Sequence, residues 1–518
     1  MNQQSPQTTS FFASRAAWIT ALLVILLLGL AIRLYDLTDL PLDYHPTRQL
    51  LSALKARGMY YQTLRGVSME LRDIAIQQWK TRASVEPAFI ERLVALTYRW
   101  TGEELWVPRL YSSMFWMTGA VFLFLLAREI TSVDGALAST AIYLFLPYGI
   151  IASRSFQPDP LMVMSIIIFW WAVYNWSLTL NPSPREALPK GAGRGAGVRA
   201  WTFAILAGLF GGFAIYIKFV AAFFVIGGGL GAALGRESIR ETLRRPQVYA
   251  MSVLGILPGA AYLIYGIWIA GFLGQQFEGR FIPAMLLSPN YYLGWVAMLN
   301  LVIGSGVLTC AFIGSFFFEK EKLRFMLGLW SAYALFGIYF NYHISSHDYY
   351  SLPLIPIVAL SIAPLAEMIL ARLKTSVAGK SAVTVILLFG IFASLWDTRT
   401  GMKSVDYRPE AAMWAEIGKT VGVNNVAGLT PDYGSRLSYW GWKDLTAWPS
   451  SGDLTYHADL RGAQPEFDKQ FEKLALMRVL FLVTDFDELD SQPLLKERLL
   501  QYPVFAEGDG YVIHDLGN

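Results

Sequence analysis

Long apolar segments recur along this chain, and they constrain its fold more than any other feature. A helix needs about 20 apolar residues to cross the hydrocarbon core of a bilayer, and eleven segments come close to that length. They are Ala16–Ile32, Leu105–Ala127, Val133–Ile151, Pro160–Leu180, Trp201–Ile217, Phe219–Leu234, Val248–Ala270, Tyr291–Phe318, Phe325–Tyr342, Tyr349–Ile369 and Ala382–Trp396. The sequence therefore predicts an all-α polytopic membrane protein with about eleven transmembrane helices.

The composition agrees with a membrane protein and excludes two other classes. Only 16% of the 518 residues are charged, whereas soluble proteins carry about 25%. A formal net charge of +3 does not indicate a nucleic-acid partner. The single cysteine, Cys310, excludes an intramolecular disulfide framework and a cysteine metal site.

Basic residues gather in four short loops, which predicts the orientation of the chain. The loops carry Arg185, Lys190, Arg194 and Arg199; Arg236, Arg240, Arg244 and Arg245; Lys320, Lys322 and Arg324; and Arg372, Lys374 and Lys380. All four fall inside if the N-terminus is cytoplasmic, as the positive-inside rule requires. We therefore expect a multi-pass protein of the bacterial inner membrane with an extracytoplasmic C-terminal domain. The Gly-, Ala- and Arg-rich stretch Lys190–Arg199 is expected to be a flexible inner loop.

Lys218 interrupts the apolar stretch Trp201–Leu234. A single helix over this stretch would be too long, and a lysine at the bilayer centre costs roughly 2.5–3.5 kcal/mol. Two short spans with Lys218 at an outer turn avoid both problems. Lys218 could then extend to the interface as a snorkelling side chain, or it could contact a phosphate.

Two segments outside the spans carry structure of their own. We divide the chain into a cytoplasmic tail (1–15), a transmembrane domain (16–397) and an extracytoplasmic domain (398–518). An outer loop (36–104) carries surface helices, whose patterning is centred on Thr47–Arg65 and Pro87–Trp100. The C-terminal part alternates helical and strand patterns, which is typical of a small α/β domain. Helices are expected near Pro409–Lys419, Phe467–Leu476 and Pro493–Leu500, and strands near Val423–Leu429, Val479–Thr484, Val504 and Tyr511–His514.

An acid, an imidazole, a guanidinium and an amide follow the first span closely, as Asp43, His45, Arg48 and Gln49. A carboxylate at the membrane surface could act as a general base on an acceptor hydroxyl. An arginine could bind a phosphate through two hydrogen bonds. The alternative is that Asp43 only caps a helix that starts near Pro46.

Two more acids open expected helices at the outer face. Asp159 precedes Pro160 soon after Arg154, and Glu86 precedes Pro87. Each acid could be a simple helix cap or a favourable charge at a helix N-terminus. Arg154 is not explained by capping, and an arginine at the outer face suits a phosphate.

The segment from His343 to Tyr350 gathers two histidines, an aspartate and two tyrosines. His343, His347 and Asp348 could bind a metal, but their spacing supplies no further strong ligand, so we expect no divalent metal cofactor. Contact of His347 and Tyr349 with a lipid phosphate or a sugar is one alternative, and an ordinary polar loop is the other.

The order of these motifs resembles the C-type membrane glycosyltransferases, most of all the bacterial branch related to protein O-mannosyltransferases and aminoarabinose transferases. The motifs are Asp43 with His45, Arg48 and Gln49; Glu86-Pro87-Ala88-Phe89; Gly102 to Arg109-Leu110; Ser153 to Asp159; and His347 to Pro356. The resemblance covers about residues 15 to 400. Relatives often have a second acid where this chain has Tyr44.

The resemblance implies transfer of a sugar from a polyprenyl-phosphate donor to a lipid, glycan or protein acceptor at the outer face. It implies that Asp43 is the catalytic base and that Asp159 supports the acceptor or the sugar. Arg154, Lys218 and His347 would contact the donor phosphate, and cations there would stabilise the leaving group. His45, Arg48, Glu86 and Tyr349 would complete the substrate site.

Two other functions remain open from the residues alone. A lipid or sugar transporter would keep ionisable groups near the midplane and often shows internal repeats. No repeat is visible, and most of the spans lack charges. A non-catalytic membrane scaffold would leave the grouping of Asp43, Arg154 and Asp159 unexplained.

Overall fold

A computed structural model describes residues 11–12, 14–82, 85–180, 193–274, 280–373, 376–455, 466–477 and 479–517. Arg185, Lys190 and Lys374 lie outside these ranges. The predicted flexible loop Lys190–Arg199 is described from Gly193 on, where helix α9 begins, so a loop is wrong for that part of the segment. The chain forms two compact units. Unit 1 comprises Met1–Leu37, Ser84–Pro87 and Pro108–Ser404, and unit 2 comprises Thr38–Ala83, Ala88–Val107 and Val405–Asn518. The predicted boundaries at residues 15 and 397 stay a prediction.

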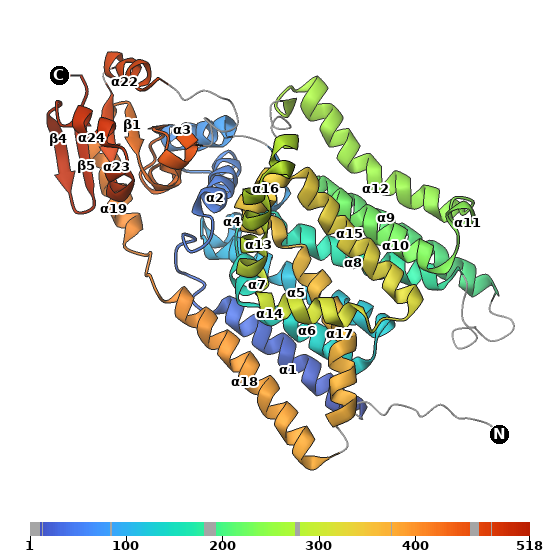
Figure 1. Ribbon diagram of the computed structural model, residues 1–518. Coiled ribbons are helices and arrows are strands. Elements are labelled where there is room, and N and C mark those ends of the chain that lie inside the picture. Colours follow the sequence, from blue (N-terminus) through green and yellow to red (C-terminus); the bar gives the residue numbers. More distant parts are fainter. Residues whose placement is uncertain are drawn as a thin grey trace, which may run out of the picture. The chain divides into compact units, whose positions relative to one another are not determined.

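The regular structure of unit 1, within its described residues, consists of helices joined by turns and loops (Figure 1). Its α-helices are α1 (Arg15–Leu34), α5 (Trp106–Ile130), α6 (Val133–Phe145), α7 (Pro147–Ala152), α8 (Asp159–Leu178), α9 (Gly193–Ile217), α10 (Ala221–Arg236), α11 (Ile239–Thr242), α12 (Pro246–Ile264), α13 (Pro289–Val302), α14 (Ser305–Ser315), α15 (Lys320–Tyr339), α16 (Asn341–Ser346), α17 (Leu354–Leu373) and α18 (Val377–Met402). Short π- and 3₁₀-helices are η1 (Tyr265–Ile269), η3 (Pro283–Leu287) and η4 (Asp348–Ser351).

The predicted spans fall largely on helices, but Val133–Ile151 is divided between α6 and α7 at Leu146, and the helices differ in length and apolarity. Within the described ranges, seven helices are long and apolar enough to cross a membrane, namely α1, α5, α8, α9, α12 with η1, α17 and α18. The α6 and α10 helices are apolar but shorter. The α15 helix covers the predicted span Phe325–Tyr342 without passing that test. A multi-pass membrane protein is supported, whereas the number of crossings stays a prediction.

The predicted span Tyr291–Phe318 is not one straight helix. The α13 and α14 helices meet at a bend of 93°. Gly304 adopts φ +83°, a conformation that favours glycine. The Ser305 backbone N–H and hydroxyl both donate to Asn300 Oδ1, at 3.1 and 2.7 Å. This local hydrogen bonding replaces helical continuity and explains the break.

Glycines bring α10 and α15 into backbone contact. A Cβ atom built on Gly227 would lie 2.5 Å from the carbonyl oxygen of Gly328, too close for any side chain. A Cβ on Gly231 would meet the Phe325 carbonyl at 2.9 Å. Small residues permit such close packing between membrane helices, where tight van der Waals contact drives association.

Unit 2 combines the helices of the first loop with the C-terminal part of the chain. Its helices are α2 (Pro46–Tyr61), α3 (Met69–Thr81), α4 (Phe89–Thr101), α19 (Glu410–Val421), η5 (Pro431–Gly434), α20 (Ser435–Trp440), α22 (Phe467–Leu476), α23 (Phe486–Asp490) and α24 (Pro493–Leu499). Its strands are β1 (Val426–Leu429), β2 (Thr446–Ala447), β3 (Leu480–Val483), β4 (Val504–Gly508) and β5 (Tyr511–Asp515). The predicted helices and strands are all found, whereas α3, α20, α23 and β2 were not predicted.

The five strands form one mixed sheet in the order β2-β1-β3-β5-β4. The β1 strand is parallel to β2 and β3, and β5 is antiparallel to β3 and β4. Successive residues of β3 point to opposite faces of the sheet and so enter different hydrophobic cores. Phe481 packs with Phe471 of α22 on one face, and Leu482 packs with Trp414 of α19 on the other. Helices therefore cover both faces of the sheet.

A buried arginine joins the first-loop helices to the C-terminal residues within unit 2. Arg57 of α2 pairs with Glu103 at 2.7 Å and donates to the Tyr439 carbonyl at 2.6 Å. Its guanidinium also lies over the rings of Tyr439 and Trp442, at 3.8 and 4.3 Å from the centroids. Such cation–π contacts strengthen when the cation is desolvated.

Candidate functional site

Lys218 lies where the sequence predicts it, at a turn between two helices. The α9 helix ends at Ile217 and α10 begins at Ala221. The turn is closed by backbone hydrogen bonds from Lys218 to Ala214 and from Ala221 to Lys218. The side chain is only 8% exposed. It is therefore not a lysine that snorkels into water, and a partner must compensate its buried charge.

That partner is Asp159, 59 positions earlier in the chain. Lys218 Nζ lies 2.9 Å from Asp159 Oδ1, and the aspartate side chain is 1% exposed. Asp159 is the first residue of α8 and Pro158 is its N-cap, without a side-chain hydrogen bond. The capping alternative for Asp159 is thus not observed. Its second oxygen, Oδ2, is buried and accepts no hydrogen bond within the described part of the chain.

Aromatic rings and histidines surround this ion pair. Lys218 Nζ lies 5.0 Å from the Tyr349 ring centroid and 5.3 Å from that of Tyr350. The Tyr350 ring lies 5.1 Å from His343, whose ring is 5.5 Å from that of His347. Lys218, His347 and Tyr349, each predicted as a substrate contact, therefore lie in one region together with Asp159, whereas their contact with a substrate stays a prediction. We call these residues, together with Arg280, the Lys218 cluster.

Arg280 completes the Lys218 cluster and sets the protonation of a histidine. Its guanidinium lies 2.8 Å from His343 Nε2 and 3.4 Å from the Tyr350 hydroxyl. Burial, reinforced by Arg280, lowers the pKa of His343 to about 3. The imidazole is therefore neutral, and since Nε2 faces a guanidinium donor, Nδ1 carries the proton. This buried Nδ1–H finds no acceptor among the described residues.

Arg154 and Glu86 also belong to unit 1. Arg154 is buried at the end of α7, where it donates to the Asp36 carbonyl at 3.0 Å and contacts the Met402 sulfur at 2.7 Å. The predicted contact of Arg154 with a phosphate stays a prediction. Glu86 precedes α4, whose N-cap is Ala88 without a side-chain hydrogen bond. Glu86 is thus not the cap of α4.

The Asp43 motif belongs to unit 2, at the start of α2. The N-cap of α2 is His45, in a left-handed conformation (φ 43°, ψ 60°), and its own side chain makes no capping hydrogen bond. His45 rather than Asp43 therefore occupies the N-cap position, and the role of Asp43 stays a prediction. Gln49 donates to the carbonyls of Tyr44 and Pro41, at 2.5 and 3.2 Å, and so fixes the turn on which half-buried Asp43 lies.

C-terminal residues of unit 2 surround this turn, which no local motif predicts. Thr47 donates to Asp432 at 3.1 Å, and Asp432 accepts from Arg436 at 2.7 Å. Burial and the nearby Asp43 carboxylate raise the pKa of Tyr407, which places this phenol close to Asp43. His45 stacks edge-on against Tyr44 at 4.5 Å, and Arg48 is half-buried in the first turn of α2.

Metal ligands do not converge at either place. In the ranges that the structure covers, no group of three or more His, Cys, Asp or Glu side chains could hold a metal ion. The chemistry available is instead that of buried cations and N–H donors in the Lys218 cluster, and of an accessible carboxylate at the Asp43 turn.

Comparisons with known proteins address the fold. Residues 85–185 match the model of a family described as dolichyl-phosphate-mannose-protein mannosyltransferase. No curated protein sequence matches the chain. Among solved structures, ArnT from Cupriavidus metallidurans matches in the apo state with a TM-score of 0.59 and 15% identity, over 97% of this chain and 98% of that one. The same protein bound to undecaprenyl phosphate matches with a TM-score of 0.55.

A second solved relative comes from an archaeon. The oligosaccharyltransferase AglB from Archaeoglobus fulgidus, in complex with an inhibitory peptide and a dolichol-phosphate, matches with a TM-score of 0.56. It is 9% identical, and the alignment covers 90% of this chain and 69% of that one. The predicted resemblance is thus confirmed at the level of the fold, which this chain shares with ArnT and AglB.

Proposed function

We propose that this chain, which has the fold of the C-type membrane glycosyltransferases, transfers a sugar from a polyprenyl-phosphate donor to an acceptor at the outer face of the membrane. The observation that carries the proposal is the Lys218 cluster. It gathers two cations, Lys218 and Arg280, with the unpaired N–H of neutral His343 in a buried aromatic setting. Buried donors of this kind suit a phosphate attached to a lipid.

The donor phosphate is the leaving group of the proposed reaction. Negative charge grows on its bridging oxygen as the bond to the anomeric carbon breaks, and preorganised cations stabilise that charge. Lys218 and Arg280 would supply them, with His343 donating from Nδ1. Asp159 cannot bind phosphate directly, because its carboxylate is itself an anion. Its unpaired Oδ2 would accept from a sugar or acceptor hydroxyl.

Asp43 would be the general base. Its carboxylate takes the proton of an acceptor hydroxyl as the oxygen forms a bond to the anomeric carbon and the lipid phosphate departs. Attack opposite the leaving group inverts the configuration at that carbon. The half-buried turn before α2 leaves the carboxylate able to meet an acceptor. His45, Arg48, Glu86, Arg154, His347 and Tyr349 remain proposed substrate contacts.

The relatives support the substrate classes. ArnT was crystallised with undecaprenyl phosphate, and AglB with a peptide and dolichol-phosphate. A polyprenyl-phosphate donor is therefore the first class to test here. The acceptor is a lipid, a glycan or a protein. Basic loops such as Arg236–Arg245 support a bacterial inner membrane location with the reacting groups outside.

The test is transfer from a panel of radiolabelled polyprenyl-phosphate sugars by the purified protein in nanodiscs. Wild type is compared with Asp43→Ala and with a matched control, Asp73→Ala, which changes an exposed acid of α3 in the same unit. We expect release or transfer of one sugar by wild type and control, and its loss in Asp43→Ala. Absence of turnover with every donor, from folded protein, would contradict the proposal and favour transport or a scaffold.

A further inference from the structure

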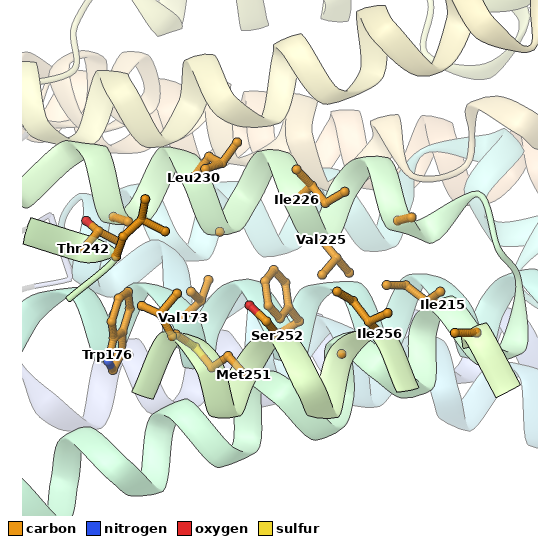
Figure 2. A pocket seen from close by; sticks show the side chains of 18 of the residues that line it. Val173, Trp176, Ile215, Val225, Ile226, Leu230, Thr242, Met251, Ser252 and Ile256 are labelled. Atoms are coloured by element: carbon orange, nitrogen blue, oxygen red, sulfur yellow. The ribbon is translucent and has the colours of Figure 1, made fainter. Parts of the chain in front are cut away.

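An apolar cavity of about 440 Å³ lies between α8, α9, α10 and α12 in unit 1 (Figure 2). Its wall follows α10 from Ala222 to Ala233. At 1.5 Å per residue this is about 16 Å. The hydrocarbon core of a bilayer is about 30 Å thick, so the cavity is as long as one lipid chain of a single leaflet. Its size and apolar lining suit one hydrocarbon tail.

Two polar groups at one end of the cavity are buried without partners. Trp176 and Thr242 both line it, and their residues are 1% and 5% exposed. Neither the Trp176 indole Nε1 nor the Thr242 hydroxyl makes a hydrogen bond within the described ranges. Figure 2 shows both side chains at the same end, opposite Ile215. Unpaired polar groups are costly in an apolar site, so these two donors indicate a ligand with an acceptor here.

Two arginines adjoin the residues that line the same end of the cavity, and we call Arg240 and Arg244 its basic rim. Ile239, Thr242 and Leu243 line the cavity, whereas Arg240 and Arg244 are exposed beside them in the chain and do not line it. Two acids lie in the same segment, and one of them, Glu241, interacts with Arg244 and Arg245. Glu237 pairs with Arg245 at 2.9 Å, and Glu241 accepts from the Ser238 hydroxyl and backbone at 2.7 and 3.0 Å. The rim is therefore suited to an anionic head group.

We propose that this cavity binds an anionic, ester-linked phospholipid from the leaflet on the side of the arginine-rich loop. One acyl chain fills the cavity, the two ester carbonyls of the lipid supply separate acceptors for Trp176 and for Thr242, and the phosphate lies at Arg240 and Arg244. A polyprenyl phosphate is a poorer occupant, because its tail carries no ester carbonyl and only its terminal phosphate could accept from these donors. The proposal does not depend on the proposed transfer reaction.

Photo-crosslinking tests the occupant directly. The full-length protein is placed in phosphatidylcholine nanodiscs that contain phosphatidylglycerol with a diazirine on one acyl chain. Crosslinked peptides are then mapped by mass spectrometry. We expect labelling on α9, α10 and α12 around Val225 and Ile256. The same diazirine on phosphatidylcholine should label these peptides less.

A cavity-filling variant provides the main comparison. Gly255 lines the cavity, and a Cβ atom there would meet no atom within 4 Å. Gly255→Leu should therefore fit and abolish the labelling. Gly390→Leu is the matched control, because Gly390 lies on α18, has equally open surroundings and does not line this cavity. Labelling of Gly255→Leu equal to that of wild type would overturn the proposal.

Polar variants test the head-group end without altering the volume greatly. Thr242→Val should reduce labelling by phosphatidylglycerol by about two- to tenfold, as expected for one lost hydrogen bond. Arg240→Gln with Arg244→Gln should remove the preference for phosphatidylglycerol over phosphatidylcholine. Equal labelling of wild type by the two lipids would contradict the anionic site. Unlabelled polyprenyl phosphate should reduce the labelling less than unlabelled phosphatidylglycerol does. If it reduced the labelling as strongly, the cavity would bind an isoprenoid tail and the proposal would be overturned.

Discussion

The Lys218 cluster of unit 1 and the Asp43 turn of unit 2 hold their charges in opposite ways. Lys218 and Asp159 are almost fully buried and face each other at 2.9 Å. Asp43 is half-buried on a turn whose shape depends on hydrogen bonds from Gln49 to the backbone. A buried pair orients charge at a high cost of desolvation. A half-buried carboxylate costs less desolvation and stays within reach of solvent. Changes at these two places should therefore have different effects.

The largest expected effect is on turnover, at the Asp43 turn. Asp43→Asn keeps the shape of the side chain and removes the base, so kcat should fall by about 10²–10⁴-fold. The donor Kd and the melting temperature should stay close to wild type. Single-turnover kinetics with the active donor measure the rate of the chemical step, and titration with donor measures its Kd. A weakened donor Kd with unchanged kcat would place Asp43 in donor binding instead.

The Lys218 cluster should show the next largest effect, on stability as well as on donor binding. Lys218→Met leaves Asp159 buried and uncompensated, which should cost about 3–5 kcal/mol of the free energy of unfolding. The double variant with Asp159→Leu should regain most of that stability, but not donor affinity. Denaturant unfolding in micelles and donor titration measure the two. A single variant as stable as wild type would show that the pair is not essential to the fold.

His343 should make the Lys218 cluster sensitive to acid. The unfolded chain binds a proton at this imidazole below about pH 6.5, whereas burial and Arg280 lower the pKa in the folded protein to about 3. The contribution of the neutral His343 side chain to the free energy of unfolding is therefore fully present above pH 6.5, and it is lost as the pH falls toward 3. At about pH 5.5 the loss should be about 1.4 kcal/mol relative to neutral pH. In His343→Gln this loss of unfolding free energy should be absent, so its stability should fall by about 1.4 kcal/mol less than that of wild type between the two pH values. Denaturant unfolding at both pH values measures the difference. An identical pH dependence of the two proteins would argue against a buried neutral imidazole.

The smallest effect concerns the C-terminal support of the Asp43 turn. Thr47→Val removes the hydrogen bond to Asp432 and should lower the stability of unit 2 by about 0.5–1.5 kcal/mol. The matched control is Thr63→Val, whose hydroxyl makes only exposed hydrogen bonds among those described: it donates to the Tyr60 carbonyl at 3.1 Å and accepts from Arg99 at 3.4 Å. Limited proteolysis of the C-terminal part measures both. Equal effects in the two variants would mean that Asp432 does not support the turn.

Local signals predicted much of the fold. The helix expected at Phe467–Leu476 is found with the same bounds, because its amphipathic pattern is local. The helix Met69–Thr81 was missed, although Ser68 caps it and Glu70 follows in the first turn, which are recognisable start signals. The 93° bend at Gly304 was missed because one glycine in an apolar run is compatible with a continuous helix.

The candidate site was only partly predictable for the same reason. Lys218 could be placed at a turn, because its charge and the lengths of the flanking segments exclude other positions. Its pairing with Asp159 and the contact of Arg280 with His343 join residues 59 and 63 positions apart. No local pattern encodes such contacts. Arg280 had no motif around it, and Tyr407 could be related to Asp43 only once the chain was folded.

The glycine contact between α10 and α15 has a consequence for the Lys218 cluster. Lys218 lies in the turn that leads into α10, and His343 lies on α16, which follows α15. The backbones of these two helices touch at Gly227 and Gly328, with no side chain between them to yield. The distance between Lys218 and His343 is thus fixed by this backbone contact, which lies about 14 Å from Lys218 along α10. A single methyl group at Gly227 would push the two helices apart. The distance between Lys218 and His343 would then depend on a residue that contacts neither of them.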